Sequence, residues 1–286
     1  SINHQARPHQ DRLIGKLACI CVIPATITGI TASWRFCMKW TTPLSFLTNQ
    51  VEVHLIGCGG TGSFVMAELS MLHELLFRIG HPGLKVTAWD GSVVREANLG
   101  RQRFRVSDLG VSKAEALITA ERLYNGFDWQ ASGDFVPETH HRYNDRDVPR
   151  IYITAVDKPS LRVAFGRMLA KRNVDNCVWI DAGNDHTNGQ VVFGAKDLPN
   201  AYDLFGAQYA VMPDDERKSC SSEEALARQD FGVNATAARI VGQLMWNMLR
   251  HGGLDSHGGF FDVSRMSVDP LPIDPNVWLT FGYSPP

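Results

Sequence analysis

Residues 51–63 read VEVHLIGCGGTGS, and this stretch decides the fold. A run rich in apolar and β-branched side chains leads directly into a loop that contains four glycines: Gly57, Gly59, Gly60 and Gly62. Residues 64–79 follow with apolar side chains at helical spacing. Strand, glycine loop and helix in this order predict a Rossmann-like nucleotide site, because glycine backbone can approach phosphate and a helix N-terminus favours an anion. The loop alone leaves the nucleotide open.

Each of two further predicted strands is followed by, or ends at, an acidic residue. Residues 85–90 (KVTAWD) end at Asp90, and residues 151–156 (IYITAV) precede Asp157. The carboxyl ends of parallel strands meet at one edge of the sheet, so both carboxylates are expected to face the crevice at the glycine loop. Asp90 is suited to bind ribose hydroxyls there, with capping of the next turn as the alternative. Asp157 is suited to hold Mg²⁺.

Cationic and amide side chains lie between these two acids. Residues 98–102 read NLGRQ, and Lys113 stands at the head of another predicted helix, while Arg162 comes one helical turn after Asp157. Splitting ATP between its α- and β-phosphates builds negative charge that Arg and Lys stabilise. Hydride transfer needs no such cluster, because the nicotinamide carries that chemistry. The pattern therefore favours ATP activation over an NAD-dependent oxidoreductase, although each side chain taken singly also suits a solvated surface.

The order of these motifs resembles the ThiF, MoeB and ubiquitin-activating (E1-like) enzyme family over roughly residues 52–246. The resemblance implies Mg²⁺- and ATP-dependent adenylation of the C-terminal carboxylate of a small ubiquitin-like or sulfur-carrier protein, by an enzyme that is commonly a homodimer. It implies a phosphate cradle formed by Gly57, Gly59, Gly60 and Gly62. It also implies that Asp90 binds the ribose and that the triphosphate is surrounded by Asn98, Arg101, Gln102 and Lys113. Asp157 would bind Mg²⁺ and, with Arg101 and Lys113, assist catalysis.

The C-terminal third resembles, more narrowly, the ThiF-like proteins of the plasmid-associated PRTRC set. The similar segments are residues 219–221 (SCS), 224–226 (EAL), 229–230 (QD), 233–234 (VN) and 269–283. This resemblance leaves a further alternative open, in which the chain is a nucleotide-binding scaffold of a plasmid-encoded assembly and does not split ATP.

Cys220 precedes a predicted long helix over residues 223–250, with Ser221 or Ser222 as its N-cap. A helix N-terminus lowers the pKa of a thiol, and in some relatives a cysteine on such a loop accepts the activated acyl group. The alternative is a half-buried residue that fixes the loop. Cys58 and Cys177 are predicted to be packing residues.

The predicted fold class is α/β, with a mostly parallel sheet over residues 48–196 that includes strands at 178–183 and 189–194. A polar crossover loop (197–221), the long helix, a late strand (260–268) and an extended tail (269–286) complete it, with an adenylation domain bounded at 48–268. Residues 1–37 are predicted to be a non-native or flexible extension before Met38. An extra helix or a targeting segment stays open, because residues 17–34 are uncharged and mostly apolar.

Composition narrows the class of protein. Among 286 residues, 44% are hydrophobic and 20% charged, which is typical of a globular protein that needs no membrane. The net charge of −2 predicts no nucleic-acid partner. Six cysteines without a CxxC pair argue against a tetrathiolate zinc site and favour the cytoplasm.

Overall fold

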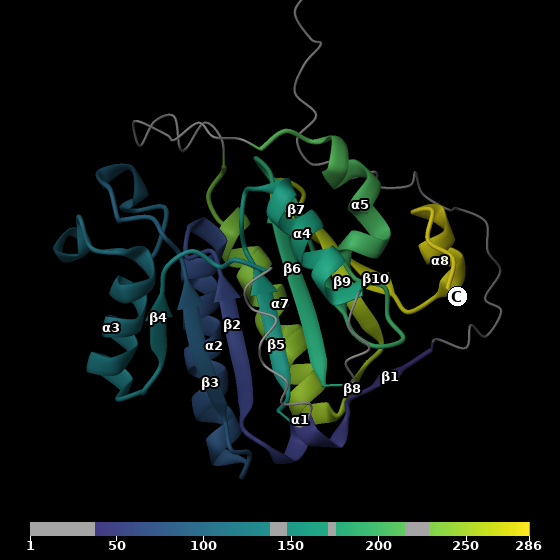
Figure 1. The fold of residues 1–286 in the computed structure, drawn as a ribbon, viewed down its shortest axis with the longest axis horizontal. Helices are drawn as coiled ribbons and strands as arrows, with labels where there is room; N and C mark the ends of the chain where they lie inside the picture. Colours follow the sequence, from purple (N-terminus) through teal and green to yellow (C-terminus); the bar gives the residue numbers. More distant parts are fainter. Residues whose placement is uncertain (1–37, 138–147, 171–175, 215–228, 286) are drawn as a thin grey trace, which may run out of the picture.

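The computed structural model describes residues 38–137, 148–170, 176–214 and 229–285. Within these ranges eight strands form one sheet in the order β10-β9-β7-β6-β5-β2-β3-β4, and β1 pairs with β8 in a small separate sheet (Figure 1). The strands are β1 (Trp40–Thr41), β2 (Val51–Ile56), β3 (Leu84–Trp89), β4 (Gln130–Ser132), β5 (Arg150–Thr154), β6 (Cys177–Asn184), β7 (Asn188–Gly194), β8 (Gly253–Leu254), β9 (Ser256–Asp262) and β10 (Ser267–Pro272). The helices are α1 (Leu44–Thr48), α2 (Gly60–Arg78), α3 (Lys113–Asn125), α4 (Pro159–Ala170), α5 (Ala201–Val211), α7 (Val233–His251) and α8 (Pro275–Thr280), with 3₁₀ turns η1 (Glu96–Asn98) and η2 (Val106–Asp108).

The half of the sheet from β6 to β4 is parallel, and its order reverses beside β2. The chain runs from β2 to β3 and β4 on one side, then returns to β5 and β6 on the other. All five residues of β5 are buried, as expected for a parallel strand covered on both faces. Ligands bind where the strand order of such a sheet reverses, at the carboxyl ends of the strands. The glycine loop follows β2 and therefore lies at this position.

The other half of the sheet is antiparallel. β6 turns directly into β7, β7 pairs with β9, and β9 pairs with β10. The prediction of one late strand over residues 260–268 is wrong, because this region forms the hairpin of β9 and β10. Met266 adopts a positive φ of 54° in the turn between the two strands. The turn has no glycine or proline, but Asp262 was a usable signal, because its Oδ1 accepts from Ser264 N–H at 2.9 Å in an Asx turn.

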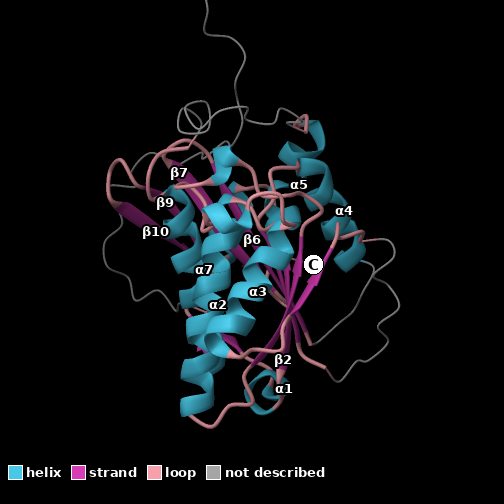
Figure 2. Cartoon of the chain, turned by 90° about the vertical axis from the view of Figure 1, so that its left-hand side faces the viewer, coloured by secondary structure: helices cyan, strands magenta, loops and turns pink. Residues whose placement is uncertain are grey.

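Helices cover both faces of the sheet. Figure 2 shows α4 and α5 on one face and α2 and α7 on the other, with α3 next to α2. On α7 the buried residues recur at helical spacing: Val233, Ala237, Val241, Leu244 and Met248. The helix starts at Val233 after Gly232, which has a φ of 87°, so the predicted start at residue 223 is wrong for the described residues 229–232. The earlier part of that prediction, with its N-cap at Ser221 or Ser222, lies outside the described residues.

Two segments predicted to be irregular contain helices. Residues 197–221 were expected to form a loop, but Asn200 caps α5 by accepting hydrogen bonds from Tyr202 N–H (2.8 Å) and Asp203 N–H (3.1 Å). The tail was expected to be extended, but β10 continues to Pro272 and Asp274 caps α8. In α8 the buried Trp278 is the anchor. Neither helix was predicted, because the caps and first turns of helices use the same polar residues and prolines that are typical of loops.

Some predictions lie outside the described residues, namely the extension 1–37 and Cys220. In the part of the chain that the structure describes, no helix has the length and apolar character to cross a membrane.

Candidate active site

The glycine loop is held closed by close backbone approaches. Gly57 has a φ of +90°, and its N–H donates to the Trp89 carbonyl at 2.9 Å. A Cβ on Gly57 would collide with the Ala155 carbonyl oxygen, and a Cβ on Gly62 with the Gly57 carbonyl oxygen. At Gly59, by contrast, a Cβ would meet nothing within 4 Å. Gly57 and Gly62 therefore fix the turn, while Gly59 faces open space where a phosphate has room.

The N-termini of two helices converge at this loop. α2 starts at Gly60, and α7 starts at Val233. A Cβ on Gly60 would lie 2.6 Å from Asn234 Oδ1, and the Thr61 hydroxyl donates to the same oxygen at 2.9 Å. Each helix of 19 residues presents the positive end of its dipole here, which favours an anion.

Asp90 follows β3 and ties the glycine loop to the next turn. Its Oδ2 accepts from Cys58 N–H at 2.8 Å, and its Oδ1 accepts from Ser92 N–H at 2.8 Å and from the Ser92 hydroxyl. The turn-capping alternative is thus present in the geometry. A carboxylate has about four acceptor positions, so these three bonds leave about one position for a ribose hydroxyl. The ribose role stays a prediction.

Charges of both signs lie around the buried Cys58. Burial raises the pKa of the Cys58 thiol well above its usual value, the Asp90 carboxylate adds to this rise, and the Lys113 ammonium opposes it. Lys113 is the first residue of α3, and its N–H donates to the Ser92 carbonyl at 2.9 Å. The loop therefore lies within the field of both Asp90 and Lys113, and Cys58 is a packing residue in this structure.

Residues 98–102 are docked onto α2 through a backbone contact. Arg103 N–H donates to the Ser63 hydroxyl at 3.1 Å, and Gln102 N–H donates to the Asn98 carbonyl at 2.9 Å. Asn98 Oδ1 is engaged in the η1 turn by Arg95 N–H at 2.8 Å. Gln102 is only 7% exposed, and its Oε1 accepts no hydrogen bond from the described residues. A buried acceptor of this kind is expected to be completed by a ligand or water.

Arg101 joins the glycine loop to α7. Its Nη1 donates to Gln229 Oε1 at 2.7 Å, and Asn234 Nδ2 donates to the same oxygen at 3.2 Å. Because Asn234 also contacts Thr61, the guanidinium of Arg101 is linked to the first turn of α2. The structure thus brings Arg101, Lys113 and Asp90 to one edge of the sheet around the loop.

Asp157 lies three residues beyond the end of β5 at the same edge and is exposed. Within the described ranges its carboxylate makes no hydrogen bond or ion pair, and no group of three His, Cys, Asp or Glu side chains gathers to hold a metal. Mg²⁺ commonly uses one or two carboxylates together with substrate phosphates. Asp157 fits that requirement as a protein ligand.

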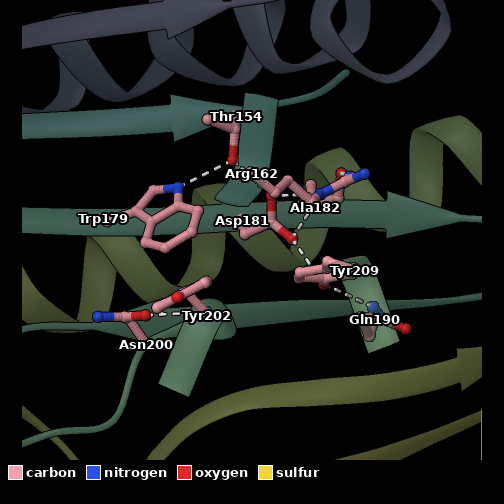
Figure 3. Close-up of polar contacts among 9 residues, drawn as sticks. All are labelled: Thr154, Arg162, Trp179, Asp181, Ala182, Gln190, Asn200, Tyr202 and Tyr209. Atoms are coloured by element: carbon pink, nitrogen blue, oxygen red, sulfur yellow. Dashed lines mark hydrogen bonds and ion pairs between the residues drawn. The ribbon is translucent and has the colours of Figure 1, made fainter. Parts of the chain in front are cut away.

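Arg162 is not in the crevice, which corrects the prediction that grouped it with Asp157. Its Nε donates to Asp181 Oδ1 at 2.8 Å and to Oδ2 at 3.0 Å, and its Nη2 donates to the Ala182 carbonyl at 3.1 Å (Figure 3). Thr154 donates to Oδ1 of Asp181 and Tyr209 to Oδ2. The Asp181 side chain is fully buried and that of Arg162 is 9% exposed, so the pair is an interior ion pair.

A hollow of about 460 Å³ opens between α4 and α5. Its lining includes Ser160, Arg167, Tyr209 and Asp214. Ser160 N–H donates to Asp214 Oδ1 at 3.0 Å. The hollow does not include the glycine loop.

Sequence reasoning missed two residues that join the glycine loop to β6 and α7, Asn184 and Thr61, and it missed Asp181, the partner of Arg162 in the interior ion pair. Asn184 ends β6 at the carboxyl edge, as a polar residue after a buried strand, and that position was a usable signal. Asp181 lies inside the same strand, where a charge contradicts a buried pattern unless it is paired. Thr61 is hidden within the glycine loop itself. Gln229 and Asn234 were noted for resemblance only, without a role.

These features define a Rossmann-like α/β fold, with its glycine loop at the position where the strand order reverses. Solved structures share the fold, which confirms the predicted class. PaaA aligns at a TM-score of 0.55 and 16% identity, over 81% of this chain and 67% of PaaA. E. coli MccB with MccA aligns at 0.53 and 16% identity, over 80% and 65%. E. coli MccB with ATP aligns at 0.51 and 17% identity, over 84% and 66%.

The chain thus spans about two thirds of the length of these proteins. MccB is also described as a microcin C7 biosynthetic enzyme. At these identities the likeness concerns the fold. No protein-family model matches the chain, and no curated protein sequence matches it.

Proposed function

We propose that this chain binds ATP at the glycine loop and transfers AMP to a carboxylate, as an E1-like adenylating enzyme. A carboxylate oxygen attacks the α-phosphorus of ATP. The new O–P bond forms as the bond from the α-phosphorus to the oxygen bridging to the β-phosphate breaks. Pyrophosphate leaves with the electron pair, and an acyl adenylate remains.

The observation that carries this proposal is the convergence of positive electrostatic groups on one loop. The N-termini of α2 and α7 meet at Gly60, and the side chains of Arg101 and Lys113 come from two further segments. Charge that develops on the α-phosphate and pyrophosphate is stabilised by such preorganised groups. Hydride transfer gains nothing from them, so the oxidoreductase alternative ranks second.

The remaining residues have roles that suit a nucleotide. Gly59 leaves room for phosphate, Asp90 binds the ribose, and Gln102 Oε1 accepts a hydrogen bond from the ligand. Asp157 holds Mg²⁺, which supplies charge neutralisation on the phosphates when bound. The Asn98 side-chain oxygen accepts from Arg95 N–H in the η1 turn, so Asn98 shapes the backbone of this turn beside the proposed nucleotide site.

The substrate that we propose is the C-terminal carboxylate of a small ubiquitin-like or sulfur-carrier protein. The motif order quoted above supports this choice, and the structures of MccB with ATP and with MccA are compatible with it. Whether Cys220 then accepts the acyl group belongs to the same proposal and requires a thioester assay. A homodimer is the expected assembly.

The decisive experiment is Mg²⁺-dependent ATP–pyrophosphate exchange by a chain that starts at Met38, with and without ubiquitin-like proteins that end in Gly-Gly. Exchange that requires the partner would establish adenylation and its substrate class. ATP binding without exchange for any partner would contradict catalysis and favour the nucleotide-binding scaffold, with its PRTRC setting.

The residue-level test is Asp157→Asn, which should lower exchange on the order of a hundredfold without loss of stability. Asp128→Asn is the matched control, because Asp128 is also an exposed aspartate in a loop, between α3 and β4. Full exchange by Asp157→Asn would remove the Mg²⁺ role.

A further inference from the structure

Three side-chain amides form a closed ring of hydrogen bonds, and one of them accepts a hydrogen bond from Arg101. Gln229 Nε2 donates to Asn184 Oδ1 at 2.9 Å, and Asn184 Nδ2 donates to Asn234 Oδ1 at 3.0 Å. Asn234 Nδ2 returns to Gln229 Oε1 at 3.2 Å and closes the ring. The three amides come from the end of β6, the start of α7 and the residues before it, so the ring joins segments that are distant in sequence.

The polarity of this ring is fixed by Arg101. A guanidinium only donates, so Gln229 must present Oε1 to the Arg101 Nη1 and turn its nitrogen to Asn184. Asn184 must then accept through Oδ1, which turns its nitrogen toward Asn234 Oδ1 and Thr61 Oγ1 (2.8 Å). Each amide has one orientation that satisfies all of these bonds. Arg101 is thereby held in register with the first turn of α2.

A neutral amide suits this task better than a carboxylate. An Arg–carboxylate pair is charge-assisted and stronger, but the anion offsets the charge of the guanidinium toward a phosphate. Gln229 Oε1 fixes Nη1 without adding a negative charge. This bond uses one of the five N–H donors of the guanidinium.

We infer that Gln229 is a positioning residue, which orients Arg101 toward the phosphates of ATP and acts only through Arg101. This inference rests on the proposed function for the role of Arg101. Asn184 and Asn234 in turn hold the Gln229 amide. Removing the Gln229 side chain removes the hydrogen bond that orients Nη1 of Arg101, which weakens the contact of the guanidinium with phosphate.

The test is a double-mutant cycle on ligand binding. Calorimetry would measure the Kd values of Mg-ATP and of adenosine for the wild type, Gln229→Ala, Arg101→Ala and the double variant. Loss of one hydrogen bond to a charged group predicts Mg-ATP binding about tenfold weaker in Gln229→Ala. In the Arg101→Ala background the same substitution should change the Kd by less than about twofold, because the coupling partner is gone. Adenosine, which lacks phosphates, should bind within about twofold of wild type throughout.

Gln243→Ala is the matched control, since Gln243 is exposed on α7 and bonds only Asn247 among the described residues. It should leave both Kd values unchanged. Two results would overturn the inference, because both indicate a general structural role. In the first, Gln229→Ala weakens Mg-ATP binding equally with and without Arg101. In the second, it weakens adenosine binding as much as Mg-ATP binding. Wild-type exchange, measured alongside, tests the proposed function separately: its absence with ATP binding intact contradicts catalysis while the cycle still decides the inference. A wild type that binds no Mg-ATP overturns both.

Discussion

Single residues in the glycine loop have two different tasks. At Gly57 and Gly62 an added Cβ would strike a backbone carbonyl oxygen, so these two positions require glycine for the fold itself. At Gly59 the space is open, so the absence of a side chain serves something other than packing. Similar glycines in the sequence thus separate into positions closed by backbone and a position that faces open space only when the neighbouring chain is in place.

We expect the variants Gly62→Ala and Gly59→Ala to fail in different ways. Gly62→Ala forces the turn apart and should lower the free energy of unfolding by several kcal/mol, about 2–4 by analogy with strained or overpacked sites. Gly59→Ala should cost less than about 1 kcal/mol yet weaken Mg-ATP binding tenfold or more, because its methyl group occupies the phosphate space. Urea unfolding and calorimetry check the pair, and wild-type ATP affinity in the Gly59→Ala variant would contradict the assignment of Gly59.

Cys58 should be inert although it lies inside the loop. Burial and the Asp90 carboxylate raise its pKa, so little thiolate forms at neutral pH, and the thiolate is the reactive form. Iodoacetamide at pH 8 should leave Cys58 unmodified in the native protein and alkylate it in urea, as read by peptide mass spectrometry. Rapid native labelling of Cys58 would show that the loop opens.

The sequence was informative on the residues at strand ends and silent on their partners. Asp90, Asp157 and the loop glycines could be located because each follows a buried apolar run. The contacts of Gln229 with Arg101 and Asn184 join segments 128 and 45 residues apart, and no local pattern encodes such pairs. Arg162 was misplaced for the same reason, since its partner Asp181 lies on another strand.

Between elements, the Asp181 carboxylate connects four parts of the fold. It accepts from Thr154 on β5, Arg162 on α4 and Tyr209 on α5, while itself standing on β6 (Figure 3). Tyr209 accepts from Gln190 of β7, and the Arg162 guanidinium lies 5.5 Å from the centre of its ring. Such a network is satisfied as a whole, so loss of any one member leaves buried polar groups without partners.

Asp181→Asn should therefore destabilise the protein strongly. It removes the charge of the ion-pair partner of the buried Arg162, and breaking a buried pair costs about 3–5 kcal/mol. The double variant Asp181→Leu with Arg162→Met should be less destabilised than Asp181→Asn, because it leaves no unpaired charge. Equilibrium urea unfolding compares them. If Asp181→Asn changes stability by less than about 1 kcal/mol, the ion pair is not a buried one in solution.

At this scale the strands were more predictable than the helices. β2, β3, β5, β6 and β7 each begin and end within two residues of their predicted bounds, because their buried side chains form apolar patterns that are visible in the sequence, alternating in β2 and β3 and continuous in β5. α5 and α8 were not predicted, since Asn200, Asp274 and Pro275 are residue types shared by loops and helix caps. Apolar patterns in the sequence therefore indicate buried strands more directly than polar residues indicate where a helix begins.

Across the whole molecule, a buried histidine contributes to attaching the C-terminal segment to the antiparallel half of the sheet. His257 on β9 lies between the Phe193 carbonyl, 3.0 Å from its Nδ1, and the Trp278 indole, whose Nε1 donates to its Nε2 at 2.9 Å. This arrangement requires a neutral imidazole with its proton on Nδ1. Burial lowers the pKa of His257 from 6.5 to about 4.

Stability should therefore fall in acid through His257. Its folded-state pKa lies below the unfolded value, so unfolding takes up a proton and stability is lost as the pH falls from 6.5 toward 4. The difference corresponds to about 3 kcal/mol when complete. Urea unfolding at pH 7.5, 6 and 5 should show a smaller loss for His257→Gln than for wild type. The lowered pKa of His73, which is also caused by burial, acts in the same direction in both proteins and cancels in the comparison. Parallel pH profiles for the two proteins would contradict this account.

The hydrogen bond between Thr61 and Asn234 spans 173 residues, and this separation has a consequence for synthesis on the ribosome. The glycine loop is translated early, but the helix whose N-terminus completes it emerges near the end of the chain. Since domains generally fold as units during synthesis, a fragment that stops before α7 carries the loop without Asn234, the partner of the Thr61 hydroxyl. Prematurely terminated products therefore lack the contact that joins the glycine loop to the N-terminus of α7.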